Sequence, residues 1–222
     1  MKNRCFLAWS VFCILAIAAV SFAWWDPTDV LLSSLNLVAA VTGMMYTLLA
    51  GRGKMLSFAF GFVNAPLYAY LSYRWGYYGD MALNVYYFVM MIPGYVCWRK
   101  NLQADPAAGI VRTRLSSRER VAWSAAIAVS AAALWWILTL VHGNRPLCDA
   151  LTNVLSIAAM VLTVRRCIEQ WVMWIAVDAI EVFMWWKVGE SSMALLAMWL
   201  LFLADGIYLF ALWIDDMRES RG

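Results

Sequence analysis

The sequence predicts an all-α membrane protein with eight helices, and two observations lead to that fold class. The 222 residues are 64% hydrophobic and only 14% charged, with a mean hydropathy of +0.69, which is more apolar than a soluble domain of this size. Several apolar runs approach the roughly 20 residues that a helix needs to cross a bilayer. A membrane β-barrel fits poorly, because its alternating strands give a much weaker hydropathy signal.

The first predicted helix covers residues 6–23 and has two interpretations. It follows Lys2 and Arg4 and ends near Ser21 and Ala23, which is the arrangement of a secretory signal peptide. Its apolar stretch is long for a signal peptide, so we expect an uncleaved membrane helix.

Seven further apolar stretches follow, separated by short polar turns and one longer basic segment that contains Pro106 and Gly109. The predicted helices cover residues 29–50, 55–73, 80–98, 120–141, 149–165, 169–187 and 193–214. The resulting plan has an extra N-terminal helix (1–28), a first three-helix unit (29–98), a basic cytoplasmic linker (99–119), an inverting linker helix (120–148), a second three-helix unit (149–214) and a cytoplasmic tail (215–222).

Basic residues gather on one side of the predicted membrane. If the N-terminus is cytoplasmic and all eight helices cross, only Arg74, Arg145 and Lys187 of the 17 Lys and Arg residues face the outside. Cytoplasmic loops of membrane proteins are enriched in Lys and Arg. The asymmetry predicts a multi-pass protein with both termini in the cytoplasm.

The two three-helix units show a weak internal repeat at nearly constant spacing. The matched pairs are Arg52 with Arg166, Asn64 with Asp178, Gly94 with Gly206, and Trp98 with Trp213. A single helix between the units gives both of them the same orientation in the membrane. Parallel repeats of this kind are a known transporter plan.

The strongest functional signal is a stripe on the seventh predicted helix. Trp171, Trp174, Asp178, Glu181 and Trp185 follow one another at steps of three or four residues, so they project from one helical face. Ionisable groups inside a bilayer usually face a protein interior or a cavity, and indole faces attract cations. The stripe predicts a pocket for a flat organic molecule that carries positive charge.

Polar side chains on other helices extend this prediction. The full set of candidate binding residues is Trp174, Asp178, Trp171, Asn64, Asn84, Tyr87, Tyr68, Trp199, Glu181 and Asn153. Asn153 could instead bridge two helices by hydrogen bonding, and Glu181 could be solvated at the outer mouth. Asp205 either faces the pocket or pairs with a donor from another helix. We expect Asn64 and Asp178, which occupy equivalent repeat positions, to approach each other.

The sequence lacks the motifs that several kinds of chemistry require. The five cysteines are scattered without a Cys-x-x-Cys pair, and the only histidine, His142, lies in a predicted loop, so neither a disulfide framework nor a zinc site is indicated. No phosphate-binding loop that would serve ATP hydrolysis is present. We therefore expect no catalytic residues, no metal, no cofactor and no nucleic-acid partner.

Three stretches resemble the PnuC-type vitamin transporters. Residues 149–178 carry an LSIAAM core, the basic turn Arg165–Arg166 and the Trp171-x-x-Trp174 pair, and the stretches GYYGDMALNVYYF at 76–88 and PGYVCW at 93–98 are similar to the family's other repeat. The resemblance covers about residues 29–214. It differs at Asp178, where Asn is more common, and at Pro93, where an aromatic residue is common.

The resemblance implies a three-one-three helix architecture like that of the SWEET sugar transporters, with one extra N-terminal helix. It implies facilitated diffusion of nicotinamide riboside, an unphosphorylated vitamin, through the bacterial inner membrane by alternating access around an aromatic pocket. A cytoplasmic kinase would trap the product. Membrane lipid surrounds such proteins, and a homo-oligomer such as a trimer fits the family. Trp171, Trp174, Asn84 and Asn64 match motif positions near the substrate path.

Other functions stay open at the level of the sequence. A relative that carries thiamine or riboflavin is one, because thiamine is also a cationic aromatic molecule. Proton coupling through Asp178 or Glu181 is another. A vitamin-binding subunit of an ATP-driven importer would need a partner for transport, whereas a membrane enzyme would need a catalytic constellation that the predicted spans lack.

Overall fold

The computed structural model describes residues 2–106, 109–142, 145–187 and 193–219, and this part of the chain forms eight α-helices. The helices are α1 (Lys2–Ala23), α2 (Val30–Gly51), α3 (Leu56–Arg74), α4 (Tyr78–Ala104), α5 (Ser117–Leu140), α6 (Pro146–Val164), α7 (Glu169–Trp186) and α8 (Met193–Glu219). The predicted all-helical class is therefore confirmed, and so are eight helices in the described ranges.

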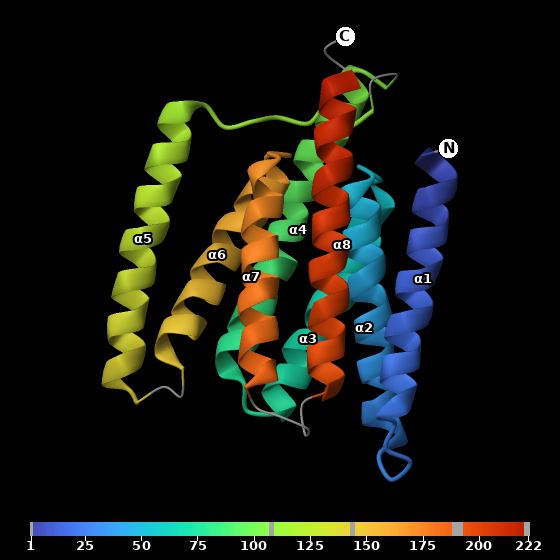
Figure 1. Cartoon of the computed structure of the whole chain (residues 1–222), viewed down its shortest axis with the longest axis vertical. Coiled ribbons are helices and arrows are strands. Elements are labelled where there is room, and N and C mark those ends of the chain that lie inside the picture. Colours follow the sequence, from blue (N-terminus) through green and yellow to red (C-terminus); the bar gives the residue numbers. More distant parts are fainter. Residues whose placement is uncertain (1, 107–108, 143–144, 188–192, 220–222) are drawn as a thin grey trace.

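Six of the helices surround a common centre. Contacts run from α2 to α3 to α4, across to α6, on through α7 to α8, and back to α2. Helix α1 packs outside this ring against α2 and α8, whereas α5 packs against α6 at the opposite edge (Figure 1). The beginning of α1, the segment between α4 and α5, and the end of α8 all lie at one end of the bundle (Figure 1). We call this the linker end, and the opposite end the far end.

Helix ends differ from the sequence prediction mainly where polar helix formers continue an apolar run. Helix α4 runs to Ala104 and α8 to Glu219, several residues past the predicted ends. Side chains such as Lys, Gln, Glu and Arg favour helix almost as well as Leu, so hydropathy underestimates the length of these helices. Helix α5 begins at Ser117, after a capping box in which Ser116 and Glu119 satisfy each other's backbone N–H groups.

Six helices, α1, α2, α4, α5, α6 and α8, are long and apolar enough to cross a membrane. Helices α3 and α7 lie beside them in the bundle, but their composition is more polar. Helix α3 carries Asn64 and Pro66, and α7 carries Glu169, Asp178 and Glu181 within 18 residues. These two helices supply much of the polar surface inside the ring.

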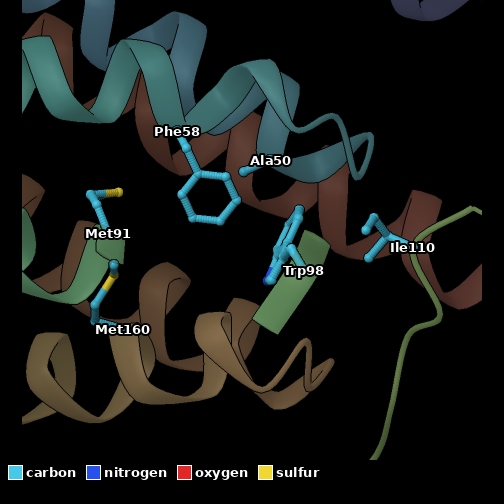
Figure 2. Packing of buried hydrophobic residues seen from close by; sticks show 6 residues of the cluster. All are labelled: Ala50, Phe58, Met91, Trp98, Ile110 and Met160. Atoms are coloured by element: carbon cyan, nitrogen blue, oxygen red, sulfur yellow. The ribbon is translucent and has the colours of Figure 1, made fainter. Parts of the chain in front are cut away.

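A hydrophobic cluster fills the linker end between α2, α3, α4 and α6. Trp98 is 1% exposed, and its ring meets Phe58 edge-on with the centroids 5.3 Å apart. Figure 2 shows this pair together with Ile110 from the linker. The Trp98 Nε1 donates to the carbonyl oxygen of Thr163 at 3.0 Å, so the indole joins the end of α4 to the end of α6.

An equivalent indole joins the other two helix ends. Trp213 of α8 is fully buried and its Nε1 donates to the carbonyl oxygen of Gly51 at 2.6 Å. A Cβ on Gly51 would lie 2.4 Å from the Leu209 side chain, so glycine permits the close approach of α2 and α8. Trp98 and Trp213, which the sequence paired as repeat equivalents, thus make the same kind of hydrogen bond across the two places where the halves of the ring meet.

The segment between α4 and α5 is held against the turn between α6 and α7. Thr113 accepts a backbone hydrogen bond from Ile168 and donates one to Arg166, forming a short parallel bridge. Arg166 has a φ of 59° and donates from Nε to the carbonyl oxygen of Val111 at 3.0 Å. Residues 109–116 of the linker therefore form an ordered strap across the end of the bundle.

Charged contacts extend the strap to α8 and α5. Arg112 forms an ion pair with Asp216 at 2.8 Å and lies over the Trp213 ring, 5.0 Å from its centroid. Burial lowers the pKa of Arg112, and the charge of Asp216 opposes that shift. Arg120 of α5 pairs with Glu169 of α7 at 2.9 Å. On the other side, the Val111 N–H donates to Asn101 Oδ1 of α4 at 2.8 Å, so the segment between α4 and α5 contacts both halves of the ring.

Candidate functional site

A cavity of about 790 Å³ occupies the centre of the six-helix ring. Its wall reaches from Trp24, Trp75 and Tyr77 at the far end to Gln170 and Trp171 next to the linker end. Cavities of this volume are typical of sites for small organic ligands. Because helices α1 to α4 and α6 to α8 all contribute to it, the cavity lies between the halves of the ring.

All ten side chains that the sequence nominated lie on the wall of this one cavity. They are Asn64, Tyr68, Asn84, Tyr87, Asn153, Trp171, Trp174, Asp178, Glu181 and Trp199. The structure therefore brings together residues from five helices, α3, α4, α6, α7 and α8, that are far apart in the sequence. Their roles toward a ligand remain a prediction.

Helix α7 presents the predicted stripe to the cavity. Asp178 lies near mid-helix and is 7% exposed. Trp174 packs edge-on against Tyr87, with ring centroids 6.0 Å apart, and its Nε1 donates to Thr163 Oγ1 at 3.3 Å. One turn beyond Asp178, the indole of Trp185 donates to Glu181 Oε2 at 3.1 Å. The wall thus presents two carboxylates between indoles along one face of α7.

Trp171 lies at the inner limit of the cavity. It is 5% exposed and meets the Trp213 ring edge-on at 5.7 Å, while its Nε1 is buried without a hydrogen-bond partner in the described structure. Trp171 therefore belongs both to the cavity wall and to the packed layer beneath it.

The three asparagines are anchored to backbone carbonyls while they line the cavity. Asn64 Nδ2 donates to the carbonyl of Ala39 at 2.7 Å, which ties α3 to α2. Asn84 and Asn153 each donate to a carbonyl four residues earlier in their own helix, at 2.9 Å and 2.7 Å. The structural role foreseen for Asn153 is thus present within one helix rather than between two.

Several polar side chains on the wall were not among the nominated residues, and three of them are Asp80, Gln170 and Asp205. Asp80 occupies the first turn of α4, where the sequence suggested only a helix start, and Gln170 opens α7 with 3% exposure. Asp205 of α8 is 1% exposed and accepts a hydrogen bond from Trp9 Nε1 at 2.9 Å. The sequence left open whether Asp205 faces the pocket or pairs with a donor from another helix. The structure shows that it lines the cavity and that its donor is Trp9 of α1.

The charge of the cavity wall has one sign. Asp80, Asp178, Glu181 and Asp205 line the cavity, and the described lining residues include no Lys, Arg or His. Within the described part of the chain, no group of three His, Cys, Asp or Glu side chains is suited to holding a metal. A low-dielectric wall with only acidic groups favours positive charge and disfavours anions.

A family model for the nicotinamide mononucleotide transporter matches residues 33–215. This chain belongs to that family. The match spans α2 to α8 and the whole linker, so it includes every nominated residue of the cavity wall. The family consists of transporters rather than enzymes, which confirms the PnuC-type resemblance and the expectation that the protein is not an enzyme.

Individual members of this transporter family cover most or all of the chain. The nicotinamide riboside transporter PnuC of Neisseria mucosa is 31% identical over 100% of this chain and 88% of its own length. The proteins of the same name from Haemophilus influenzae and Escherichia coli are 23% and 24% identical, over 85% of this chain and 83% and 88% of their own lengths.

A solved structure of the same family has the same fold. The crystal structure of the vitamin B3 transporter PnuC superposes with a TM-score of 0.78 at 31% identity, covering 96% of this chain and 92% of that one. A transporter of this fold with several helices apolar enough to span a bilayer is a multi-pass membrane protein.

Proposed function

We propose that this protein takes up nicotinamide riboside through the cavity inside its helix ring. Nicotinamide riboside carries a flat pyridinium ring with a permanent positive charge, a ribose with hydroxyl groups, and no phosphate. The proposal rests above all on one observation, the cavity wall with four carboxylates and no basic side chain among its described residues. Such a wall suits the riboside and disfavours the phosphate of the mononucleotide, in agreement with the names of the relatives.

The ring would bind along the α7 stripe. Cation–π contact with a desolvated indole contributes about 2 kcal/mol, and Trp174 is oriented for it by Thr163 and Tyr87. Asp178 would face the positive charge. The ribose hydroxyls would pair with the polar groups of Asn84, Tyr87 and Asn153, which line the cavity on α4 and α6.

Transport would follow from two similar halves of the ring. We take α2 to α4 and α6 to α8 as parallel repeats joined by α5, a three-one-three plan like that of the SWEET transporters with α1 added outside. The matching indole hydrogen bonds of Trp98 and Trp213 support this assignment. Rocking one repeat against the other would close the far end and open the linker end, which is alternating access around a fixed site.

The direction of uptake follows from the basic residues. The linker end carries Arg112, Arg165 and Arg166, as well as the beginning of α1 and the end of α8, and by the positive-inside rule this end would face the cytoplasm of a bacterial inner membrane. The cavity then reaches the external side in this structure. A cytoplasmic kinase that phosphorylates the riboside would keep its free concentration low, so uptake needs no other energy source.

Uptake into proteoliposomes that contain only this protein tests the proposal. We expect nicotinamide riboside to enter until the inner and outer concentrations are equal, and nicotinamide mononucleotide to stay outside. Protein-free liposomes and the variant Trp136→Ala, which changes an exposed residue of α5, serve as the two controls.

The remaining outcomes separate the alternatives. Accumulation above the external level under an imposed pH gradient would indicate proton coupling. No uptake of any vitamin would indicate a subunit that needs a partner. Thiamine is the second candidate substrate, since its charged ring fits the same carboxylates, and uptake of thiamine without uptake of the riboside would replace our assignment.

A further inference from the structure

Asp205 is a buried carboxylate with only one of its two oxygens satisfied. Its side chain is 1% exposed on α8, and Oδ1 accepts the hydrogen bond from Trp9 Nε1 at 2.9 Å. Its Oδ2 is buried and makes no hydrogen bond of normal geometry in the part of the chain that the structure describes, and the neutral Thr47 side chain of α2 lies close to the carboxylate. The residue lines the central cavity, so its carboxylate lies beside the space that a ligand would occupy.

An unpaired carboxylate in such a place needs a partner of opposite charge. Burying an isolated charge is costly, and ionisable groups in a membrane interior are normally paired or line a functional path. The described wall of the cavity offers no Lys, Arg or His. A cationic ligand would supply the positive charge that the wall lacks.

A second carboxylate faces the same part of the cavity. Asp178 of α7 lies close enough to Asp205 for their charges to interact. The two helices approach closely here, because a Cβ on Gly206, the residue next to Asp205, would lie 3.6 Å from Asp178 Oδ2. Two acidic groups on neighbouring helices thus concentrate negative potential in one region.

Helix α1 fixes the orientation of the Asp205 carboxylate from outside the ring. Trp9 is itself held by aromatic neighbours, with its ring 5.3 Å from Tyr208 of α8 and 5.6 Å from Phe12 of α1. Its indole N–H therefore points at one oxygen of Asp205 and leaves the other for the cavity. Helix α1 contributes a positioning residue to the site although it lies outside the six-helix ring.

We propose that Asp205 is a second cation-binding group of the cavity, oriented by Trp9, and that it shares with Asp178 the positive charge of a flat cationic ligand. This inference deepens the proposed function and rests on it. It predicts that the preference for a cationic over a neutral ligand depends on α1. The dependence would come through the hydrogen bond from Trp9 to Asp205, although the ligand does not contact Trp9.

Calorimetric titration of the purified full-length protein with two ligands of nearly the same shape tests the inference. Nicotinamide riboside is the cationic probe, and its reduced form, dihydronicotinamide riboside, is the neutral one. Asp205→Asn keeps the shape of the side chain and an oxygen that can accept from Trp9. We expect the Kd of the cationic probe to rise about fivefold and that of the neutral probe to change less than about twofold.

Variants of α1 separate orientation from general packing. Trp9→Phe keeps a ring against Tyr208 but removes the N–H, and we expect the cationic probe to weaken by roughly two- to threefold with the neutral probe unchanged. Phe12→Leu is the matched control, because Phe12 packs on Trp9 but is 54% exposed. It should leave both affinities unchanged. If Asp205→Asn does not fold, Trp9→Phe carries the test alone.

Three results would overturn the inference. An equal loss for both probes in Asp205→Asn, with a lower Tm, would make Asp205 a structural residue. Unchanged affinities in Asp205→Asn and Trp9→Phe would show that the ligand's charge lies elsewhere, and this would leave the proposed function intact. A wild-type protein that binds neither probe would overturn the proposed function and the inference together.

Discussion

The linker end of the helix ring and the central cavity differ in how their buried polar side chains are paired. At the linker end, the charged and aromatic anchors are paired within the protein: the indoles of Trp98 and Trp213 donate to carbonyl oxygens, and Arg112 pairs with Asp216, although the Ser57 Oγ is buried without a partner in the described structure. In the cavity, Asp178 and Asp205 are just as buried, but the described wall supplies no positive charge for them. The first region stabilises the fold, whereas the second leaves interactions open for a ligand.

Substitutions in the two regions should therefore change different measured properties. Substitutions at the linker end should lower thermal stability and leave the relative affinity for different ligands unchanged. Substitutions in the cavity should do the reverse, because their side chains complete their interactions only when a ligand binds. A linker-end substitution that changes the relative affinity for different ligands, or a cavity substitution that only lowers thermal stability, would show that the regions are not separate.

Trp98→Ala should have the largest effect on stability. Replacing a buried Trp by Ala costs about 3–5 kcal/mol, and here it also removes the hydrogen bond to Thr163 and the contact with Phe58. The Tm in detergent, measured by the fluorescence of a thiol-reactive or environment-sensitive dye, should fall by several degrees or more. Trp136→Ala, at a position 65% exposed on α5, is the control and should leave Tm almost unchanged. Equal falls in the Tm of both variants would show that the linker end contributes no more to stability than an exposed position of α5.

Trp174→Ala should have the largest effect on affinity. Loss of one desolvated cation–π contact should weaken binding of nicotinamide riboside by about 1–2 kcal/mol, roughly 5- to 30-fold in Kd. Trp174→Phe should retain part of the affinity because it keeps an aromatic face. Wild-type affinity in a folded Ala variant would mean that Trp174 only packs against Tyr87.

Asp178→Asn should separate charge from shape in the cavity. The variant keeps the size of the side chain and avoids a buried charge, so its Tm should not fall. Its affinity for nicotinamide riboside should drop by about 1 kcal/mol, with no comparable loss for the neutral reduced riboside. A lower Tm with an unchanged preference for the cationic ligand would instead make Asp178 a tie between helices.

Arg112→Gln should have the smallest effect. A partly exposed ion pair contributes about 0–1 kcal/mol, so losing the contact with Asp216 should lower Tm slightly and leave Kd for the riboside unchanged. The uptake rate should change more than the affinity, because the strap connects both halves of the ring at the end that must open. A change in Kd with unchanged uptake kinetics would contradict this separation.

The sequence was most informative where chemistry and periodicity coincide. The stripe from Trp171 to Trp185 repeats at helical spacing and carries charge inside an apolar run, so its shared face could be predicted without a structure. All the nominated residues lie on one cavity wall for the same physical reason: polar groups in membrane helices are driven to the protein interior. Helix ends were less predictable, because polar helix formers extend α4 and α8 beyond their apolar segments.

What the sequence could not provide were the contacts between distant segments. Asp205 and Trp9 are 196 residues apart, and no local pattern links an indole in the first helix to a carboxylate in the last. The linker resembled an ordinary basic loop, yet Thr113 pairs with the α6–α7 turn through backbone atoms that carry no sequence signal. Both features depend on tertiary packing.

The central claim is that the acidic cavity selects positive charge, and a direct comparison of three ligands tests it. Calorimetric titration of the wild-type protein would compare nicotinamide riboside, its neutral reduced form and nicotinamide mononucleotide, three ligands that differ mainly in the charge of the ring and in the presence of a phosphate. The account predicts the lowest Kd for the riboside, a higher Kd for the reduced form, and the highest for the mononucleotide, whose phosphate meets four carboxylates and no described basic partner. A mononucleotide that binds as tightly as the riboside, or more tightly, would contradict the account.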